Sequence, residues 1–253
     1  MASRRNITEL SWPDFKEQAQ SNTLALLPVG SVEAYGPHLP LGTDGLVALA
    51  LARGLSDRIG CLVGPLVPVG WTAVLADFPG SLSVPTTALY AYCKGIVESL
   101  LNGGLTSVIF VNGHAGNMAV LDELCYELAT RAKGGFLACV NTWQFIQPLS
   151  FDMLDSTANK FGHAAELNTS VMLHLYPELV NMSRAMAGSS ARPVDPVGIT
   201  RPYRFSEVAP SAILGDATLA TAEKGKRIFE LALDKLTEYI VHSPAVAFDK
   251  GDE

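Results

Sequence analysis

The sequence contains no apolar stretch long enough to cross a membrane, since a spanning helix needs about 20 predominantly apolar residues. The longest candidate, Leu46 to Leu55, is interrupted by Arg53 and Gly54. The first 15 residues include two arginines but no apolar run after them, so they do not resemble a secretion signal. We therefore expect neither a membrane span nor export.

Basic charge and cysteine are also scarce. The 25 Asp and Glu residues outnumber the 18 Lys and Arg residues, and the net charge of −7 gives no electrostatic footprint for nucleic acid or an anionic membrane. The four cysteines form no Cys-x-x-Cys pair, which disfavours a zinc cluster or disulfide framework and indicates free thiols in a reducing cytoplasm. The sequence lacks a G-x-S-x-G elbow, a Walker loop and a G-x-G-x-x-G fingerprint, so serine hydrolases, nucleotide hydrolases and dinucleotide-binding enzymes are not supported.

Apolar material is abundant, with 48% hydrophobic against 17% charged residues, which excludes intrinsic disorder. Short apolar runs alternate with segments of helical periodicity. The strand-like runs cover residues 24–29, 61–69, 106–111 and 136–141, and the helical segments cover residues 45–59, 87–101, 117–133, 165–176 and 218–240. This order predicts one α/β domain over residues 1–253, with a mainly parallel sheet covered by helices on both faces and an extended arm at residues 188–210.

Acidic and histidine side chains gather in three short segments. Two of them, residues 30–44 and 111–117, directly follow predicted strands, and the third, residues 161–170, opens a predicted helix. The candidate residues are Glu33, Tyr35, His38, Asp44, His114, His163 and Glu166. Loops at the carboxyl ends of parallel strands line the binding crevice, and carboxylates with imidazoles suit a divalent cation. The pattern therefore indicates a metal site that hydrolyses an amide without a protein nucleophile.

Each candidate also has a purely structural interpretation. Asp44 is explained by an N-cap, Glu166 by the dipole at a helix start, and His114 by backbone bonding in a glycine-rich turn. Taken one at a time, these interpretations are favoured over a functional one. Taken together they are weaker, because three separate segments would each carry a ligand-type group by accident.

The segment PVGSVEAYGPHLPLGTD resembles the first signature of the creatininase (creatinine amidohydrolase) family, usually G-S-x-E-x-H-G-P-H-L-P-x-x-T-D. VNGHAGN resembles the second signature and GHAAELNTS the third, and FPGSLSV and GDATLATAEKG are similar to further family segments, in order from residue 24 to about residue 225. The resemblance implies a three-layer α/β/α sandwich, one or two divalent metal ions per chain (zinc, manganese or iron), hydrolysis of non-peptide or unusual C–N bonds, and often a hexamer.

The resemblance also implies roles for individual residues. The positions that match metal ligands are Glu33, Asp44, His114 and Glu166, with Asp44 in the bridging position. His163 matches a proton-transfer histidine, and His38 matches a family histidine to which no role is assigned. The expected catalytic group is therefore His163, Glu166 and His38.

The chain departs from the family pattern at two histidine positions, which carry Tyr35 and Leu75. A phenol is a poor substitute for an imidazole ligand, since its pKa of about 10 makes the anion costly unless a metal stabilises it. Three outcomes stay open: a mononuclear enzyme held by Glu33, Asp44 and His114, ligation by Tyr35 as a phenolate that favours iron, or loss of catalysis.

We expect a metal-dependent hydrolase that cleaves a C–N bond, in an amide, formamide or cyclic amide of a small polar molecule, through a metal-bound hydroxide. His163 or a carboxylate would pass a proton to the leaving nitrogen. Creatinine is a weaker candidate, because creatininase proper has a glutamate where this chain has Gly116. The alternatives are a metal-poor ligand-binding or assembly subunit, and a C–C hydrolase that opens a cyclic ketone. Candidate pocket residues are Trp71, Trp143, Arg201, Tyr203 and Arg204.

Overall fold

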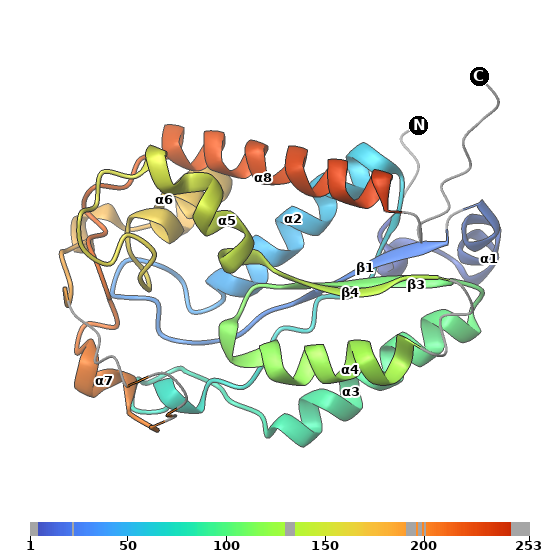
Figure 1. The fold of residues 1–253 in the computed structure, drawn as a ribbon, viewed down its shortest axis with the longest axis horizontal. Coiled ribbons are helices and arrows are strands. Elements are labelled where there is room, and N and C mark those ends of the chain that lie inside the picture. The colour runs from blue at the N-terminus through green and yellow to red at the C-terminus, as the bar shows by residue number, and fades with distance from the viewer. Residues whose placement is uncertain are drawn as a thin grey trace.

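The computed structural model describes residues 5–21, 23–129, 135–190, 196, 199 and 201–243, and within them four parallel strands form one sheet (Figure 1). The strands lie in the order β2-β1-β3-β4, and their bounds are β1 (Leu24–Val29), β2 (Leu62–Val63), β3 (Ser107–Asn112) and β4 (Leu137–Asn141). β1 pairs with β3 from Leu24 opposite Ser107 to Val29 opposite Asn112. Both strands are buried along their whole length, because helices cover both faces of the sheet.

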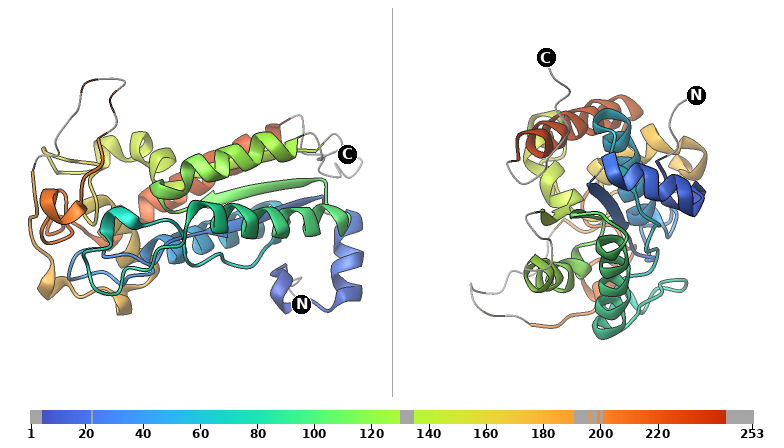
Figure 2. Two further views of the ribbon diagram at one scale, coloured as in Figure 1. Left: turned by 90° about the horizontal axis from the view of Figure 1, so that it is seen from below. Right: turned by 90° about the vertical axis from the view of Figure 1, so that its right-hand side faces the viewer.

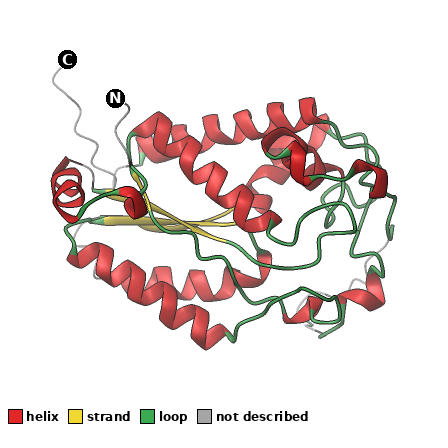
Figure 3. Ribbon diagram, turned by 180° about the vertical axis from the view of Figure 1, so that it is seen from behind, coloured by secondary structure: helices red, strands yellow, loops and turns green. Residues whose placement is uncertain are grey.

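The helices form two layers, one on each face of the sheet (Figures 1 and 3). The first layer contains α2 (Thr43–Ile59), α5 (Thr142–Ser150), α6 (Glu166–Leu175) and α8 (Ala222–His242). The second contains α3 (Thr86–Asn102) and α4 (Met118–Ala129), which lie side by side (Figure 2). The short helices α1 (Trp12–Ser21) and α7 (Phe205–Val208) lie at opposite ends of the molecule. The arrangement confirms the predicted three-layer α/β/α sandwich.

Single 3-10 turns connect several of these elements, at Ile7–Glu9, Ala73–Leu75, Ala115–Asn117, Phe151–Met153, Pro177–Leu179 and Met182–Arg184. None of the described helices combines the length and apolar character needed to cross a membrane. Instead, the apolar side chains fill the spaces on either side of the sheet. Leu26 and Val111 belong to the cluster under α2 and α8, whereas Leu27 and Phe110 belong to the cluster under α3 and α4. Successive strand residues therefore serve opposite faces.

The structure differs from the sequence predictions at one strand and two helices. The apolar run at residues 61–69 forms only the two-residue β2 and an isolated bridge at Val67, because Pro65 and Pro68 lack the N–H that a ladder needs. Two helices, α1 and α5, were not predicted, and α5 contains Pro148. Two predictions fall partly outside the described residues: the end of the helix at 117–133 and much of the arm at 188–210. The described part of the arm contains α7.

Two glycines allow the first turn of α2 to approach the carboxyl ends of β1 and β3. A Cβ at Gly30 would lie 2.3 Å from the Cα of Gly45, and a Cβ at Gly113 would lie 2.2 Å from the backbone oxygen of Asp44. Both distances are far shorter than real Cβ contacts, and the obstructing atoms belong to backbone. Glycine is therefore required where each strand ends, because α2 starts directly against it.

We expect Gly113→Ala to lower the free energy of unfolding by about 1–3 kcal/mol, because the new methyl group must push α2 away from β3. The matched control is Gly95→Ala in the middle of α3, where a Cβ meets no atom within 4 Å. This control should stabilise the chain by about 0.5–1 kcal/mol, because alanine loses less backbone entropy in a helix. Urea unfolding followed by circular dichroism measures both, and equal stabilities would contradict the packing argument.

Candidate metal centre

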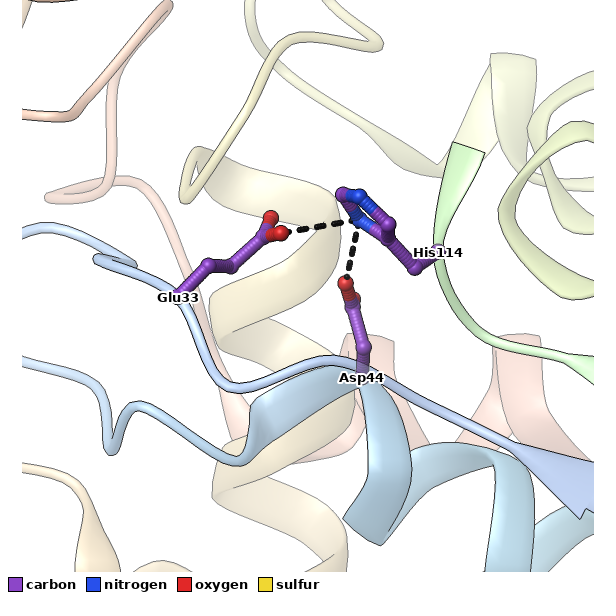
Figure 4. Close-up of side chains that lie close together, drawn as sticks. All are labelled: Glu33, Asp44 and His114. Atoms are coloured by element: carbon purple, nitrogen blue, oxygen red, sulfur yellow. Dashed lines mark hydrogen bonds and ion pairs between the residues drawn. The ribbon is translucent and has the colours of Figure 1, made fainter. Parts of the chain in front are cut away.

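Three ligand-type side chains meet beyond the carboxyl ends of β1 and β3 (Figure 4). Glu33 lies in the loop that leaves β1, Asp44 lies in the first turn of α2, and His114 follows β3. One ligand atom from each lies within 4.8 Å of the others, and the described residues contain no second group of three His, Cys, Asp or Glu side chains with this property. All three side chains are buried. The sequence predicted each of them as a metal ligand.

Two asparagines hold the backbone around His114. Asn112 Oδ1 accepts a hydrogen bond from the His114 amide (3.1 Å), and Asn112 Nδ2 donates to the His114 carbonyl (2.8 Å). Asn117 Nδ2 donates to the carbonyl of Gly30 (3.0 Å), which connects this turn to the end of β1. The polar residues of the segment VNGHAGN therefore orient the histidine that they flank.

The imidazole of His114 presents one nitrogen to the two carboxylates. Its Nε2 lies 2.9 Å from the carbonyl oxygen of Trp71, which can only accept, so Nε2 carries a hydrogen. Its Nδ1 lies 2.9 Å from Glu33 Oε2 and 3.1 Å from Asp44 Oδ2. A histidine ligand commonly donates its second ring N–H to a carbonyl or carboxylate in this way, which fixes the ring and its tautomer.

The electrostatics of the three groups suit a cation. Burial opposes a charge on His114, but the neighbouring Asp44 and Glu33 outweigh burial and raise the pKa of His114 to about 10. Burial also opposes ionisation of Asp44, yet its contacts with His114 hold the pKa of Asp44 below its usual value. Glu33 Oε2 forms the 2.9 Å ion pair with His114 Nδ1, but no donor meets this buried oxygen with hydrogen-bond geometry. A divalent cation would provide that oxygen with a partner and compensate the second carboxylate, so this donor set fits a metal ion.

Asp44 is held by three further side chains. Ser31 Oγ donates to Oδ2 (2.8 Å), and the Tyr35 hydroxyl (2.7 Å) and Trp143 Nε1 (2.8 Å) both donate to Oδ1. Burial, followed by the charges of Asp44 and Glu33, raises the pKa of Tyr35 well above its ordinary value, so the phenol keeps its proton. The structure thus places Tyr35 beside the centre as a donor to Asp44. Direct ligation of a metal by Tyr35 stays a prediction.

His163 lies next to Glu33. Its Nε2 is 2.9 Å from the carbonyl oxygen of Ala34, so Nε2 donates, and its Nδ1 lies 3.9 Å from Glu33 Oε1. The ring packs between Tyr35 and Phe205, with centroid distances of 4.2 Å and 4.9 Å. The structure therefore brings the predicted proton-transfer histidine to the edge of the centre.

His38 contacts α6 rather than the three ligand-type side chains. Its Nε2 lies 2.8 Å from Thr169 Oγ1, and its buried Nδ1 has no hydrogen-bond partner. Burial lowers the pKa of His38 to about 4, so the ring is neutral at physiological pH. A catalytic role for His38 stays a prediction.

Glu166 begins α6, and its carboxylate is engaged elsewhere. Oε1 accepts from the Asp155 amide (3.0 Å) and from Lys224 Nζ (2.5 Å), and Oε2 accepts from the amide (2.8 Å) and hydroxyl (2.7 Å) of Ser156. Burial opposes its ionisation, but Lys224 and these donors outweigh burial and lower the pKa of Glu166. Glu166 does not belong to the group of Glu33, Asp44 and His114. The expectation that it ligates a metal stays a prediction.

The sequence did not identify Ser31 or Lys224 as site residues, although both lie within the quoted segments GSVE and TAEKG. Of the candidate pocket residues, Trp71 and Trp143 do contact the centre, through a carbonyl and an indole N–H. Arg204 instead donates to Asp77 (3.2 Å) on the exposed side of the molecule. The position of each donor depends on packing between elements that are distant in sequence.

Comparison with known proteins places the chain among hydrolases. The family model for creatininase, described as creatinine amidohydrolase, matches residues 8–240. The mycofactocin precursor peptide peptidase of Mycobacterium ulcerans (strain Agy99) is 33% identical over 227 residues, covering 83% of this chain and 81% of the relative. The creatinine amidohydrolase of Pseudomonas putida is 25% identical over 256 residues, covering 92% and 95%. A solved structure named "Creatininase Mn" has a TM-score of 0.79 at 25% identity, covering 93% and 97%.

We expect Glu166→Gln to lower the free energy of unfolding by about 1–3 kcal/mol, because it removes the buried carboxylate beside Lys224 and leaves that ammonium with the exposed carboxylate of Asp155 alone. The control is Glu238→Gln, which breaks an exposed pair with Lys235 and should change stability by less than about 0.5 kcal/mol. Chemical denaturation at neutral pH measures both variants.

The same pair predicts a pH dependence. The pKa of Glu166 is lower in the folded than in the unfolded chain, so its stabilisation is present above the unfolded value of about 4.3 and is lost as the pH falls through the folded value. The stability difference between wild type and Glu166→Gln should therefore shrink below about pH 4. A difference that stays constant at acid pH would contradict an electrostatic role for the pair.

His38 should titrate far below an ordinary histidine. The pKa of His38 is about 4 in the folded chain and about 6.5 in the unfolded chain. Between pH 4 and pH 6.5, therefore, the His38 ring is protonated in the unfolded chain and neutral in the folded chain. Its contribution to stability is therefore lost as the pH falls from about 6.5 to about 4. NMR of the histidine ring protons measures the pKa, with the exposed His242 as internal control. A His38 resonance that titrates near pH 6.5 would contradict its burial.

Proposed function

Because the chain belongs to the creatininase family, we propose that it is a metal-dependent hydrolase that cleaves an amide C–N bond at the centre formed by Glu33, Asp44 and His114. One observation carries the proposal: the buried carboxylates of Glu33 and Asp44 both face Nδ1 of His114. The other ring nitrogen, Nε2, donates to the Trp71 carbonyl. This donor set suits a borderline divalent cation. Zinc, manganese and iron all stay compatible with it.

A divalent ion held at this centre would lower the pKa of a water molecule and polarise the substrate carbonyl. The chain contributes the positions of the ligands, because Trp71 fixes the ring of His114 and Ser31 orients the carboxylate of Asp44. It also limits access of water, since the three ligand-type side chains are at most 8% exposed. A water-poor site strengthens every electrostatic interaction within it.

His163 is the group best placed to move a proton. Its side chain is 17% exposed, more than any of the three ligand-type side chains, so a substrate can approach it. Nδ1 is the ring nitrogen that the Ala34 carbonyl does not engage, and it faces Glu33 Oε1 at 3.9 Å. We therefore assign His163 Nδ1 the uptake of a proton and its delivery to the leaving nitrogen of the amide.

The substrate is an amide of a small polar molecule or of a short peptide end. The peptidase from Mycobacterium ulcerans acts, by its name, on a precursor peptide, and the Pseudomonas putida enzyme on creatinine. Both names imply cleavage of a C–N bond next to a carbonyl. The narrower expectation of a non-peptide amide, formamide or cyclic amide stays a prediction, and peptide amides belong in the first substrate panel.

Other expectations from the sequence are untested. They include a ligand-binding or assembly subunit without catalysis, a C–C hydrolase that opens a cyclic ketone, a cytoplasmic location and a hexamer. The first competes directly with the proposed function, and the convergence of Glu33, Asp44 and His114 favours the hydrolase over it.

We expect His114→Ala to weaken Mn²⁺ binding by more than about 100-fold, because it removes the nitrogen that both carboxylates face. Changes to residues that only orient a ligand typically weaken metal binding by about 10- to 100-fold. Hydrolysis of the responsive amide in the panel should be lost with it. The control is His242→Ala at the exposed end of α8, which should bind metal and hydrolyse like wild type. Isothermal titration calorimetry and product analysis measure the two properties, and a fully active His114→Ala enzyme would remove the proposal.

A further inference from the structure

The two oxygens of Asp44 have different surroundings. Oδ2 accepts from Ser31 Oγ (2.8 Å) and lies 3.1 Å from His114 Nδ1, on the side shared with Glu33 (Figure 4). Oδ1 accepts from the Tyr35 hydroxyl (2.7 Å) and from Trp143 Nε1 (2.8 Å). A carboxylate has about four lone-pair sites, two on each oxygen. Both sites of Oδ1 are therefore used by Tyr35 and Trp143, whereas one site of Oδ2 faces His114 Nδ1, where a bound cation would replace the imidazole hydrogen.

A carboxylate that bridges two metal ions uses two lone pairs, either one on each oxygen or both on one oxygen. Asp44 directs a single lone pair, on Oδ2, toward the other ligand-type groups. We propose that the centre binds a single metal ion per chain, because Tyr35 and Trp143 occupy the Asp44 oxygen that a second ion would require. The proposal rests on the proposed function and deepens it. It defines the number of ions and makes Tyr35 and Trp143 positioning residues for the carboxylate.

Neither donor can easily give way to a second ion. The indole N–H of Trp143 is a donor with no lone pair to offer, so it cannot act as a ligand. Tyr35 is 3% exposed, and Trp143 packs against the apolar cluster under α2 and α8. If an ion displaced them from Oδ1, each would leave a polar hydrogen without its present partner in a largely water-free space, which is unfavourable.

Among the described residues, no second group of three ligand-type side chains converges to hold another ion. The carboxylate of Glu166 already faces the ammonium of Lys224 and three further donors. A side chain at position 116, two residues after His114, has no room, since a Cβ there would lie 2.4 Å from the Trp71 carbonyl oxygen. Within the described ranges, no other trio of His, Cys, Asp and Glu ligand atoms converges.

The first experiment counts ions on the untagged wild-type chain, stripped with chelator and reloaded with excess Mn²⁺. We expect one Mn²⁺ per chain by mass spectrometry and by calorimetry, with the electron paramagnetic resonance pattern of an isolated ion. Two ions with an exchange-coupled spectrum would overturn this proposal and leave the hydrolase standing. No bound ion would overturn the proposed function, and this inference with it. One ion without hydrolysis of any amide would support the inference and count against the proposed function.

The second experiment tests the two donors. Tyr35→Phe and Trp143→Phe each remove one hydrogen bond from Asp44 Oδ1 and keep an aromatic ring in place. We expect each to raise the Kd for Mn²⁺ by about tenfold or more, because partners that orient a ligand typically contribute 10- to 100-fold in metal affinity. The controls are Tyr92→Phe and Trp12→Phe, whose side chains are 56% and 79% exposed and which should bind like wild type. Circular dichroism establishes that each variant is folded, and wild-type affinity in both Tyr35→Phe and Trp143→Phe would overturn the positioning role.

Discussion

The buried carboxylate of Asp44 is the interaction on which the centre depends. A carboxylate is tolerated in a protein interior when its lone pairs are used. Here the partners are Ser31 and Tyr35 from the loop after β1, Trp143 from α5, and His114 from the turn after β3. Satisfying one buried charge thus connects two loops and two helices at a single point, and this connection orients the ligand-type atoms before any substrate arrives.

The acidic residues that the sequence grouped together serve two different electrostatic units. Glu33 and Asp44 face an imidazole and leave a place for a cation, whereas Glu166 faces the ammonium of Lys224. The charge of Lys224 compensates Glu166 and joins the start of α6 to the start of α8. A carboxylate is therefore suited to a metal ion at Glu33 and Asp44, which face an imidazole. At Glu166 it is suited to a structural ion pair, because it faces an ammonium group.

Backbone geometry and side-chain chemistry support each other at this edge of the sheet. Gly30 and Gly113 permit the close approach of α2, and that approach brings Asp44 within reach of His114. Family membership makes hydrolysis the expected chemistry. In the proposed single-ion centre, the two aromatic donors on Asp44 restrict the carboxylate to one ion-binding direction.

Local patterns were sufficient for β1, β3 and β4 and for the three ligand-type residues. β1 spans the predicted residues 24–29, and Glu33, Asp44 and His114 stand in segments whose strand ends could be located from apolar runs and glycines. The partners of these groups needed the tertiary structure. Trp143 bonds an oxygen 99 residues away, and Lys224 pairs with a carboxylate 58 residues away. Periodicity indicates which face of an element is apolar, but contacts between polar groups that are distant in sequence arise only when the layers pack. That packing decided that Glu33 and Asp44 contact a histidine, whereas Glu166 contacts a lysine.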